Sequence, residues 1–128
     1  MSINWALYKN FSEDELACNC NKCGRSECKE ELVAKLQLLR DEVGFPIRLS
    51  SAFRCRDWNA KVGGHPRSSH MEGLAVDCLV DGERALKLIE AAIRLGFSGV
   101  GVSQKGKGQK FIHLDIKETP TKRIWSYA

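Results

Sequence analysis

The sequence predicts an α+β fold with a small, largely antiparallel sheet flanked by helices. Two amphipathic helical stripes and four short strand-like runs alternate along 128 residues. The last two strand-like runs are joined by a short Lys/Gly/Gln turn, which is typical of antiparallel pairing. This length predicts a single domain, residues 1–128. Hydrophobic residues make up 43% and charged residues 28%, which excludes disordered, collagen-like and coiled-coil classes.

The first half of the chain contains one long predicted helix and one predicted strand. Ser12 and Glu15 have the spacing of a capping box, which predicts a short helix there. A polar, cysteine-rich loop follows at about 18–28. The alternating segment 47–53 predicts a strand. The long helix covers 29–43, ends before Gly44, and carries an apolar stripe of Leu32, Leu36, Leu39 and Val43.

The second half predicts three strands and a second long helix. A loop-rich segment, 54–73, contains a possible short helix at about 57–62. Strands are expected at 75–80, 98–103 and 110–116. The helix at about 83–95 has Asp81 as its expected cap, Gly96 at its end, and a buried stripe of Leu86, Ile89 and Ile93.

Two of these strands place ionisable side chains opposite an apolar face. Period-two alternation puts His113 and Asp115 on one face of 110–116, and Asp77 opposite Val76 in 75–80. His70 lies in the loop just before. His70, Asp77 and His113 form a good zinc set, since three protein ligands leave the fourth position for water, as in catalytic sites. The alternative from spacing alone is two surface histidines and a capping aspartate.

The segment Ser68–Asp77 fits the pattern S-x-H-x-x-G-x-A-x-D at every fixed position. It resembles the signature of the zinc D-Ala-D-Ala carboxypeptidases and L-alanyl-D-glutamate endopeptidases of peptidoglycan, a family that includes VanX-like and VanY-like enzymes and phage endolysins. Segments 51–55, 59–64, 111–115 and 123–127 are similar to further motifs of that family, so the resemblance covers about 11–127. It implies a zinc metallopeptidase with the hedgehog/DD-peptidase zinc fold.

The resemblance also implies roles for individual residues. His70, Asp77 and His113 match the zinc ligands. Arg54 matches an arginine that binds substrate near the scissile carbonyl, as a guanidinium can; the alternative is a surface salt bridge. Ser68 is expected to support the site and contact substrate, or only to cap its loop. Gly73 lets the chain turn tightly after His70.

The general base is the point where the sequence departs from the family. The family places an acidic residue or a histidine two or three residues before the last zinc ligand, where this chain has Lys110 and Phe111. Asp115 is the best substitute as a catalytic base. The alternative is that Asp115 orients a zinc-bound imidazole. Glu72 and His65, in the loop beside His70, are further candidates.

Six cysteines are present, four of them between 18 and 28. Cys18, Cys20, Cys23 and Cys28 have the density of a metal site and predict a possible second, structural zinc. Disulfides, with Cys55 or Cys78 as partners, and plain thiols are the alternatives. Cys78 is expected to be buried on the core face of its strand.

The net charge of +4 suits an anionic partner such as the polymers of a cell wall. We expect a monomer that acts on the stem peptide of peptidoglycan, either as an endopeptidase or as a carboxypeptidase. The alternative is a non-catalytic zinc-fold module. Basic residues of the cysteine-rich loop alternate with glutamates, which argues against nucleic-acid binding. No apolar run predicts membrane insertion. With no signal peptide recognised, we expect cytoplasmic synthesis and phage-mediated release to the wall or periplasm.

Overall fold

The computed structural model describes residues 2–127, and its elements follow in chain order. A single 3-10 turn, η1 (Trp5–Leu7), comes first. The helices are α1 (Glu13–Leu16), α2 (Glu30–Val43), α3 (Arg56–Lys61) and α4 (Gly82–Arg94). The strands are β1 (Arg48–Ser51), β2 (Ala75–Leu79), β3 (Gly99–Ser103), β4 (Phe111–Asp115) and β5 (Arg123–Ser126).

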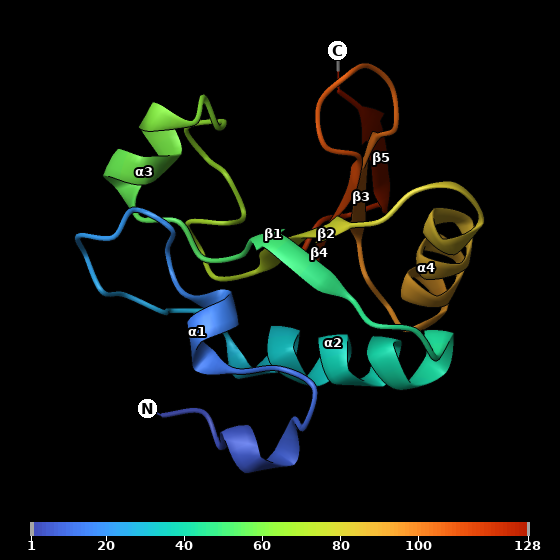
Figure 1. The fold of residues 1–128 in the computed structure, drawn as a ribbon, viewed down its shortest axis with the longest axis horizontal. Coiled ribbons are helices and arrows are strands. Elements are labelled where there is room, and N and C mark those ends of the chain that lie inside the picture. Colours follow the sequence, from blue (N-terminus) through green and yellow to red (C-terminus); the bar gives the residue numbers. More distant parts are fainter. Residues whose placement is uncertain (1, 128) are drawn as a thin grey trace.

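One five-stranded sheet organises the protein (Figure 1). Its strand order is β1-β2-β4-β3-β5, and every neighbouring pair is antiparallel except β3 and β5, which are parallel. The predicted α+β class with a largely antiparallel sheet is therefore confirmed. Among residues 2–127, no helix has both the length and the apolar character needed to cross a membrane.

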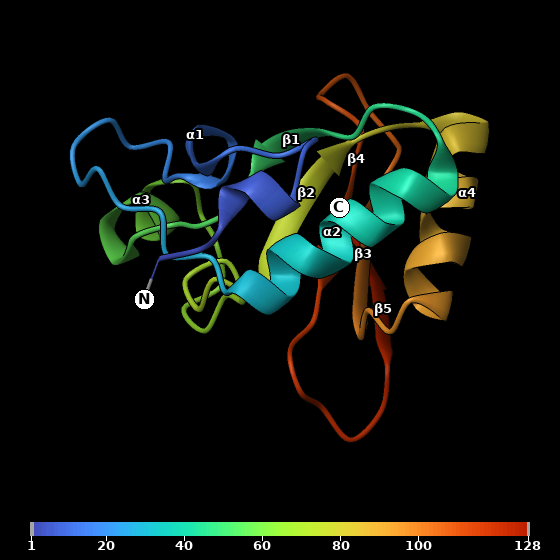
Figure 2. The ribbon, with the colours of Figure 1, turned by 90° about the horizontal axis from the view of Figure 1, so that it is seen from below.

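Helix α2 covers one face of the sheet (Figure 2). Its predicted stripe is largely confirmed, because Leu32, Leu36 and Leu39 are completely buried. They pack in one core with the apolar faces of the central strands, which include Val76 and Leu114. Burying a leucine side chain contributes about 1.5–3 kcal/mol, so this layer supplies much of the stability. The ionisable side chains of β2 and β4 consequently point to the opposite face of the sheet.

The termini of the helices follow local sequence signals. Ser12 and Glu15 form the predicted capping box, with the Glu15 amide donating to Ser12 Oγ at 3.3 Å. Gly44 ends α2 with a φ of +73°, a conformation that glycine adopts without steric cost. Asp81 occupies the predicted cap position of α4, but its side chain accepts no hydrogen bond there.

The prediction of which face of α4 is buried is wrong. Leu86 and Ile93 are 71% and 45% exposed, and of the three predicted residues only Ile89 packs against the core. The buried face instead contains Ala85, Leu88, Ala91 and Ala92. The small alanine side chains let α4 approach its neighbours closely. The sequence prediction followed the large apolar side chains and therefore chose the adjacent face of the helix. Close packing therefore overrode hydrophobic periodicity.

Strand β5 was not predicted, since its segment carries no clear apolar alternation. Ile124, its most apolar residue, is 74% exposed at the sheet edge. The strand is held by parallel pairing with β3, in which Ile124 lies opposite Val100 and Trp125 opposite Gly101. This pairing depends on a partner distant in sequence, so local composition does not reveal it.

Truncating Leu88 should test the corrected orientation of α4. We expect Leu88→Ala to lower the free energy of unfolding by about 2–5 kcal/mol, because it leaves a cavity in the core. The matched variant Leu86→Ala should change it by less than about 0.5 kcal/mol. Urea unfolding of both variants measures the difference, and equal destabilisation would contradict the buried face described above.

Candidate metal centre and active site

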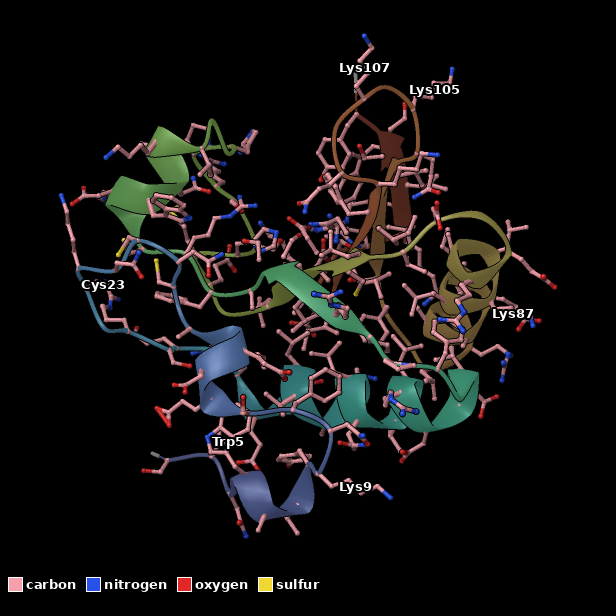
Figure 3. The ribbon with its side chains drawn as sticks, in the orientation of Figure 1. Trp5, Lys9, Cys23, Lys87, Lys105 and Lys107 are labelled. Carbon is pink, nitrogen blue, oxygen red and sulfur yellow. The ribbon has the colours of Figure 1, made fainter. Side chains whose placement is uncertain are left out.

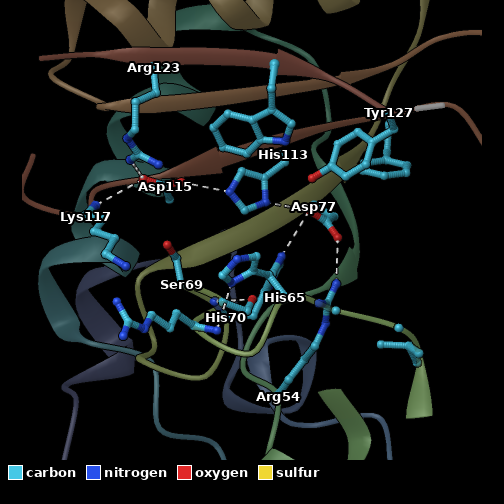
Figure 4. Close-up of a pocket in the computed structure, with 17 residues that line it drawn as sticks. Arg54, His65, Ser69, His70, Asp77, His113, Asp115, Lys117, Arg123 and Tyr127 are labelled. Atoms are coloured by element: carbon cyan, nitrogen blue, oxygen red, sulfur yellow. Dashed lines mark hydrogen bonds and ion pairs between the residues drawn. The ribbon is translucent and has the colours of Figure 1, made fainter. Parts of the chain in front are cut away.

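His70, Asp77 and His113 converge on the face of the sheet opposite α2 (Figure 4). Asp77 on β2 and His113 on β4 lie directly opposite each other in the antiparallel register. Asp77 Oδ1 is 3.1 Å from His113 Nδ1 and 3.2 Å from His70 Nε2. All three side chains are buried, and their potential ligand atoms lie within 4.8 Å of one another.

The outer nitrogens of both imidazoles are fixed by acceptors. His70 Nδ1 is 2.7 Å from the carbonyl oxygen of Ala52, which can only accept, so Nδ1 carries a proton. His113 Nε2 is 2.8 Å from Asp115 Oδ2 and donates to that carboxylate. In the neutral imidazoles, His70 Nε2 and His113 Nδ1 are therefore lone-pair donors that face Asp77.

This arrangement fits a zinc ion. Two imidazole lone pairs and a carboxylate oxygen meet with no hydrogen between them, and such a group is stable only around a cation or a proton. Two neutral histidines and one carboxylate are a donor set of catalytic zinc sites. Burial alone would lower the pKa of His113, but hydrogen bonds to Asp115 and Asp77 outweigh it and raise that pKa. A proton and a metal ion therefore compete for Nδ1.

Arg54 holds the second oxygen of Asp77. Its Nη2 donates to Asp77 Oδ2 at 3.2 Å, while Nε donates to Ser51 Oγ and Nη1 to Asn59 Oδ1. This ion pair is almost wholly buried, unlike the surface salt bridge considered from the sequence. Burial alone would raise the pKa of Asp77, but its contacts with the imidazoles of His113 and His70 outweigh burial and hold that pKa below its ordinary value. Asp77 therefore stays ionised and oriented.

Asp115 lies behind His113 and is completely buried. Its Oδ2 accepts from His113 Nε2, and its Oδ1 accepts from Arg123 Nη2 and from the Lys117 amide. Burial would raise the pKa of Asp115, but the bonds from His113 and Arg123 lower it, so it is a carboxylate. With its lone pairs engaged, its geometry favours the orienting role over that of a base.

The remaining candidates from the sequence belong to the loop that carries His70. Ser68 Oγ accepts from the His70 amide at 3.2 Å, which supports the loop, and Ser68 also lines the pocket. Gly73 has a φ of +73°, as its predicted turn requires. Glu72 pairs with Lys117 at 3.4 Å. His65 lines the pocket, and its Nδ1 accepts from the Arg67 amide.

The sequence analysis assigned no individual role to several residues that contribute to the site. Arg123 on β5 binds Asp115, and the Trp125 ring lies 5.0 Å from the His113 ring. A Cβ on Gly99 or Gly101 of β3 would collide with the Asp115–Arg123 pair or with Trp125. Two glycines alternating within a strand pattern are a signal of such close approach.

The cluster forms part of the lining of an open pocket of about 670 Å³. The loop carrying His65 and Ser68 lies on one side, and aromatic residues of β5 and the segment after it lie on the other. Tyr127 is half-exposed at this wall, and burial is the main cause that raises its pKa. The guanidinium of Arg54 also reaches the pocket.

Comparison with known families identifies the family of the chain. The family model described as Peptidase M15 matches residues 9–115, a range that includes the candidate ligands His70, Asp77 and His113. The chain belongs to the peptidase M15 family. No curated protein matches the chain in sequence. An M15 peptidase is a zinc metallopeptidase of the class that acts on peptidoglycan, so the enzyme interpretation is confirmed over a non-catalytic module. Arg123 and Trp125 of this M15 peptidase lie outside the matched range.

Replacing Asp115 distinguishes its two candidate roles. If Asp115 orients His113, Asp115→Asn should weaken zinc binding by about 10–100-fold. Competition with a chelator measures that affinity, and Glu118→Gln is the control because Glu118 is exposed nearby. Full zinc affinity together with abolished hydrolysis would instead identify Asp115 as the base.

Adding one methyl group to β3 should disturb the pocket wall. The Cβ of Gly101→Ala would lie 2.6 Å from Trp125 Nε1, so the indole, whose ring lies 5.0 Å from the His113 ring, must shift. We expect a change in tryptophan fluorescence and reduced peptidase activity. Gly108→Ala is the matched control, since a Cβ there meets no atom within 4 Å. Unchanged fluorescence and activity in Gly101→Ala would contradict this role of the glycine.

Proposed function

We propose that this M15 peptidase cleaves the stem peptide of bacterial peptidoglycan as a phage-type endolysin. The buried His70, Asp77 and His113 cluster, open to a pocket that also holds Arg54, carries this proposal. The positive net charge supports it, because anionic wall polymers would retain a basic protein. We place its synthesis in the cytoplasm and its action at the wall or periplasm after phage-mediated release.

The catalytic ion would be held by His70 Nε2, Asp77 and His113 Nδ1. Zinc in this position supplies a Lewis acid and lowers the pKa of a bound water molecule. The chain keeps both imidazoles in the required tautomer through Ala52 and Asp115. These contacts also fix the ring orientations before substrate arrives, so little rearrangement is required during the reaction.

Arg54 is suited to polarise the scissile carbonyl. Three of its N–H groups bind Ser51, Asn59 and Asp77, and this fixes the guanidinium at the pocket. The outward N–H groups of Nη1 and Nη2 remain for a substrate oxygen. A pre-positioned donor of this kind stabilises charge that develops on the carbonyl oxygen. Arg54 thus orients a metal ligand and serves the substrate at the same time.

Arg67 is our candidate for binding a substrate carboxylate. Arg54 and Arg123 are engaged with Asp77 and Asp115, and Lys117 with Glu72. Arg67 is exposed, lines the pocket, and has no ion-pair partner among residues 2–127. Both the L-Ala-D-Glu and the D-Ala-D-Ala bond have a carboxylate on the residue after the scissile carbonyl. The same arginine therefore suits either substrate.

Digestion of peptidoglycan tests the proposed function. Purified protein is incubated with peptidoglycan that retains D-Ala-D-Ala stems, with and without a chelator, and mass spectrometry identifies the products. We expect chelator-sensitive release of stem peptides or of D-Ala, and the new termini show which bond is cut. His113→Ala should abolish the products and Glu118→Gln should not. No chelator-sensitive product from the wild type would overturn the proposal.

Removing the charge of Arg67 tests its assignment. Arg67→Gln should raise KM while leaving kcat within a few-fold, because the lost ion pair is made equally in the ground and transition states. Arg56→Gln is the control, an exposed arginine on α3. Steady-state hydrolysis of a soluble stem peptide measures both constants. An unchanged KM would exclude Arg67 from substrate binding.

A further inference from the structure

Four cysteines from distant segments gather beside the start of α3, where Figure 3 shows sulfur atoms near the labelled Cys23. Cys18, Cys20 and Cys23 come from the loop between α1 and α2, and Cys55 directly precedes α3. We propose that these four residues bind a second, structural zinc ion. This proposal is independent of the substrate and of the catalytic site.

The membership of this cluster corrects the prediction from the sequence. Cys28 was expected as the fourth ligand because it lies near the other three along the chain. In the structure it is buried elsewhere, and its Sγ donates to the Leu16 carbonyl oxygen at 3.7 Å. Cys55 takes its place, with Sγ 3.9 Å from Cys20 Sγ.

The spacing of the sulfur atoms suits a tetrahedral metal site. All four lie within 4.8 Å of one another. Zinc–sulfur bonds of about 2.3 Å place tetrahedral sulfurs about 3.8 Å apart, close to the Cys20–Cys55 separation. A disulfide instead requires sulfurs about 2 Å apart, and the six cysteines are all unpaired in the structure. Four ligands would close the coordination sphere, as in structural zinc sites.

Backbone amides point at each of the four sulfurs. Cys18 Sγ accepts from the Cys55 amide at 3.3 Å, and Cys55 Sγ accepts from Trp58 at 3.5 Å. Cys23 Sγ accepts from the Arg25 amide at 3.4 Å. Cys20 Sγ accepts from two amides, those of Lys22 and Cys23. Such donors stabilise thiolates, which are the metal-binding form.

Besides the contacts to sulfur, a few hydrogen bonds hold the loop, among them one from Asn19 Nδ2 to the Ser50 carbonyl oxygen at 3.0 Å. It contains neither helix nor strand, and among its few backbone bonds is one from the Cys18 amide to the Arg25 carbonyl at 2.9 Å. Positive φ values at Asn21 and Gly24 fold the Cys20–Cys23 segment around the sulfurs. A metal ion there would fix this loop against Cys55, which is the neighbour of Arg54 and the cap of α3.

Counting zinc in purified variants tests the second site. The full chain, produced in reducing medium with zinc, should hold about two zinc ions by elemental analysis. His113→Ala and Cys23→Ser should each lose about one, and the double variant should lose both. Cys28→Ser is the matched control and should keep both. One zinc in the wild type, lost in His113→Ala and retained in Cys23→Ser, would overturn the proposal.

Cobalt provides a readout that does not depend on the folding of Cys23→Ser. Cobalt bound by thiolates absorbs strongly through sulfur-to-metal charge transfer, whereas a histidine and carboxylate site does not. The wild type and His113→Ala loaded with cobalt should both show this absorption. Its absence from both proteins, or cysteines that can be alkylated only after reduction of disulfides, would refute the structural metal site.

Discussion

The antiparallel register between β2 and β4 is the constraint on which the site depends. It places Asp77 directly opposite His113, and both face away from the core that α2 covers. Side chains alternate along a strand, so a slip by one residue would bury these polar groups among leucines and expose Val76 and Leu114. The free energy of packing the core thus also determines where Asp77 and His113 lie.

From Asp77 and His113, a row of acidic and basic side chains extends through the pocket in both directions. Arg54, Asp77, His113, Asp115 and Arg123 follow one another, each within hydrogen-bond distance of the next (Figure 4). An uncompensated buried carboxylate would be costly, and in this chain each carboxylate has a cationic or imidazole neighbour on both sides. The neighbours in this row keep Asp77 and Asp115 ionised. One oxygen of Asp77 is left facing both histidines.

The sequence predicted those features that depend on local periodicity. Alternation in β2 and β4 placed His113 and Asp77 correctly, and the Ser12 and Gly44 signals marked helix ends. Features that depend on distant partners were missed. Strand β5 exists through pairing with β3. Cys55 joins the cysteine cluster although it lies 32 residues after Cys23, and the buried face of α4 combines Leu88 with three alanines. Neither chain proximity nor hydrophobic pattern contains that information.

Gly99 and Gly101 make room for the ion pair and the indole that support His113. Glycine loses more backbone entropy on folding than any other residue, so each costs about 0.5–1 kcal/mol relative to alanine within a strand. Strand β3 nevertheless lies inside the sheet, between β4 and β5. Its neighbours must therefore supply the order that its own residues lack. The space beside His113 is therefore obtained at a cost in conformational stability. Selection for a more stable sheet would replace these glycines with larger residues, and their side chains would fill that space.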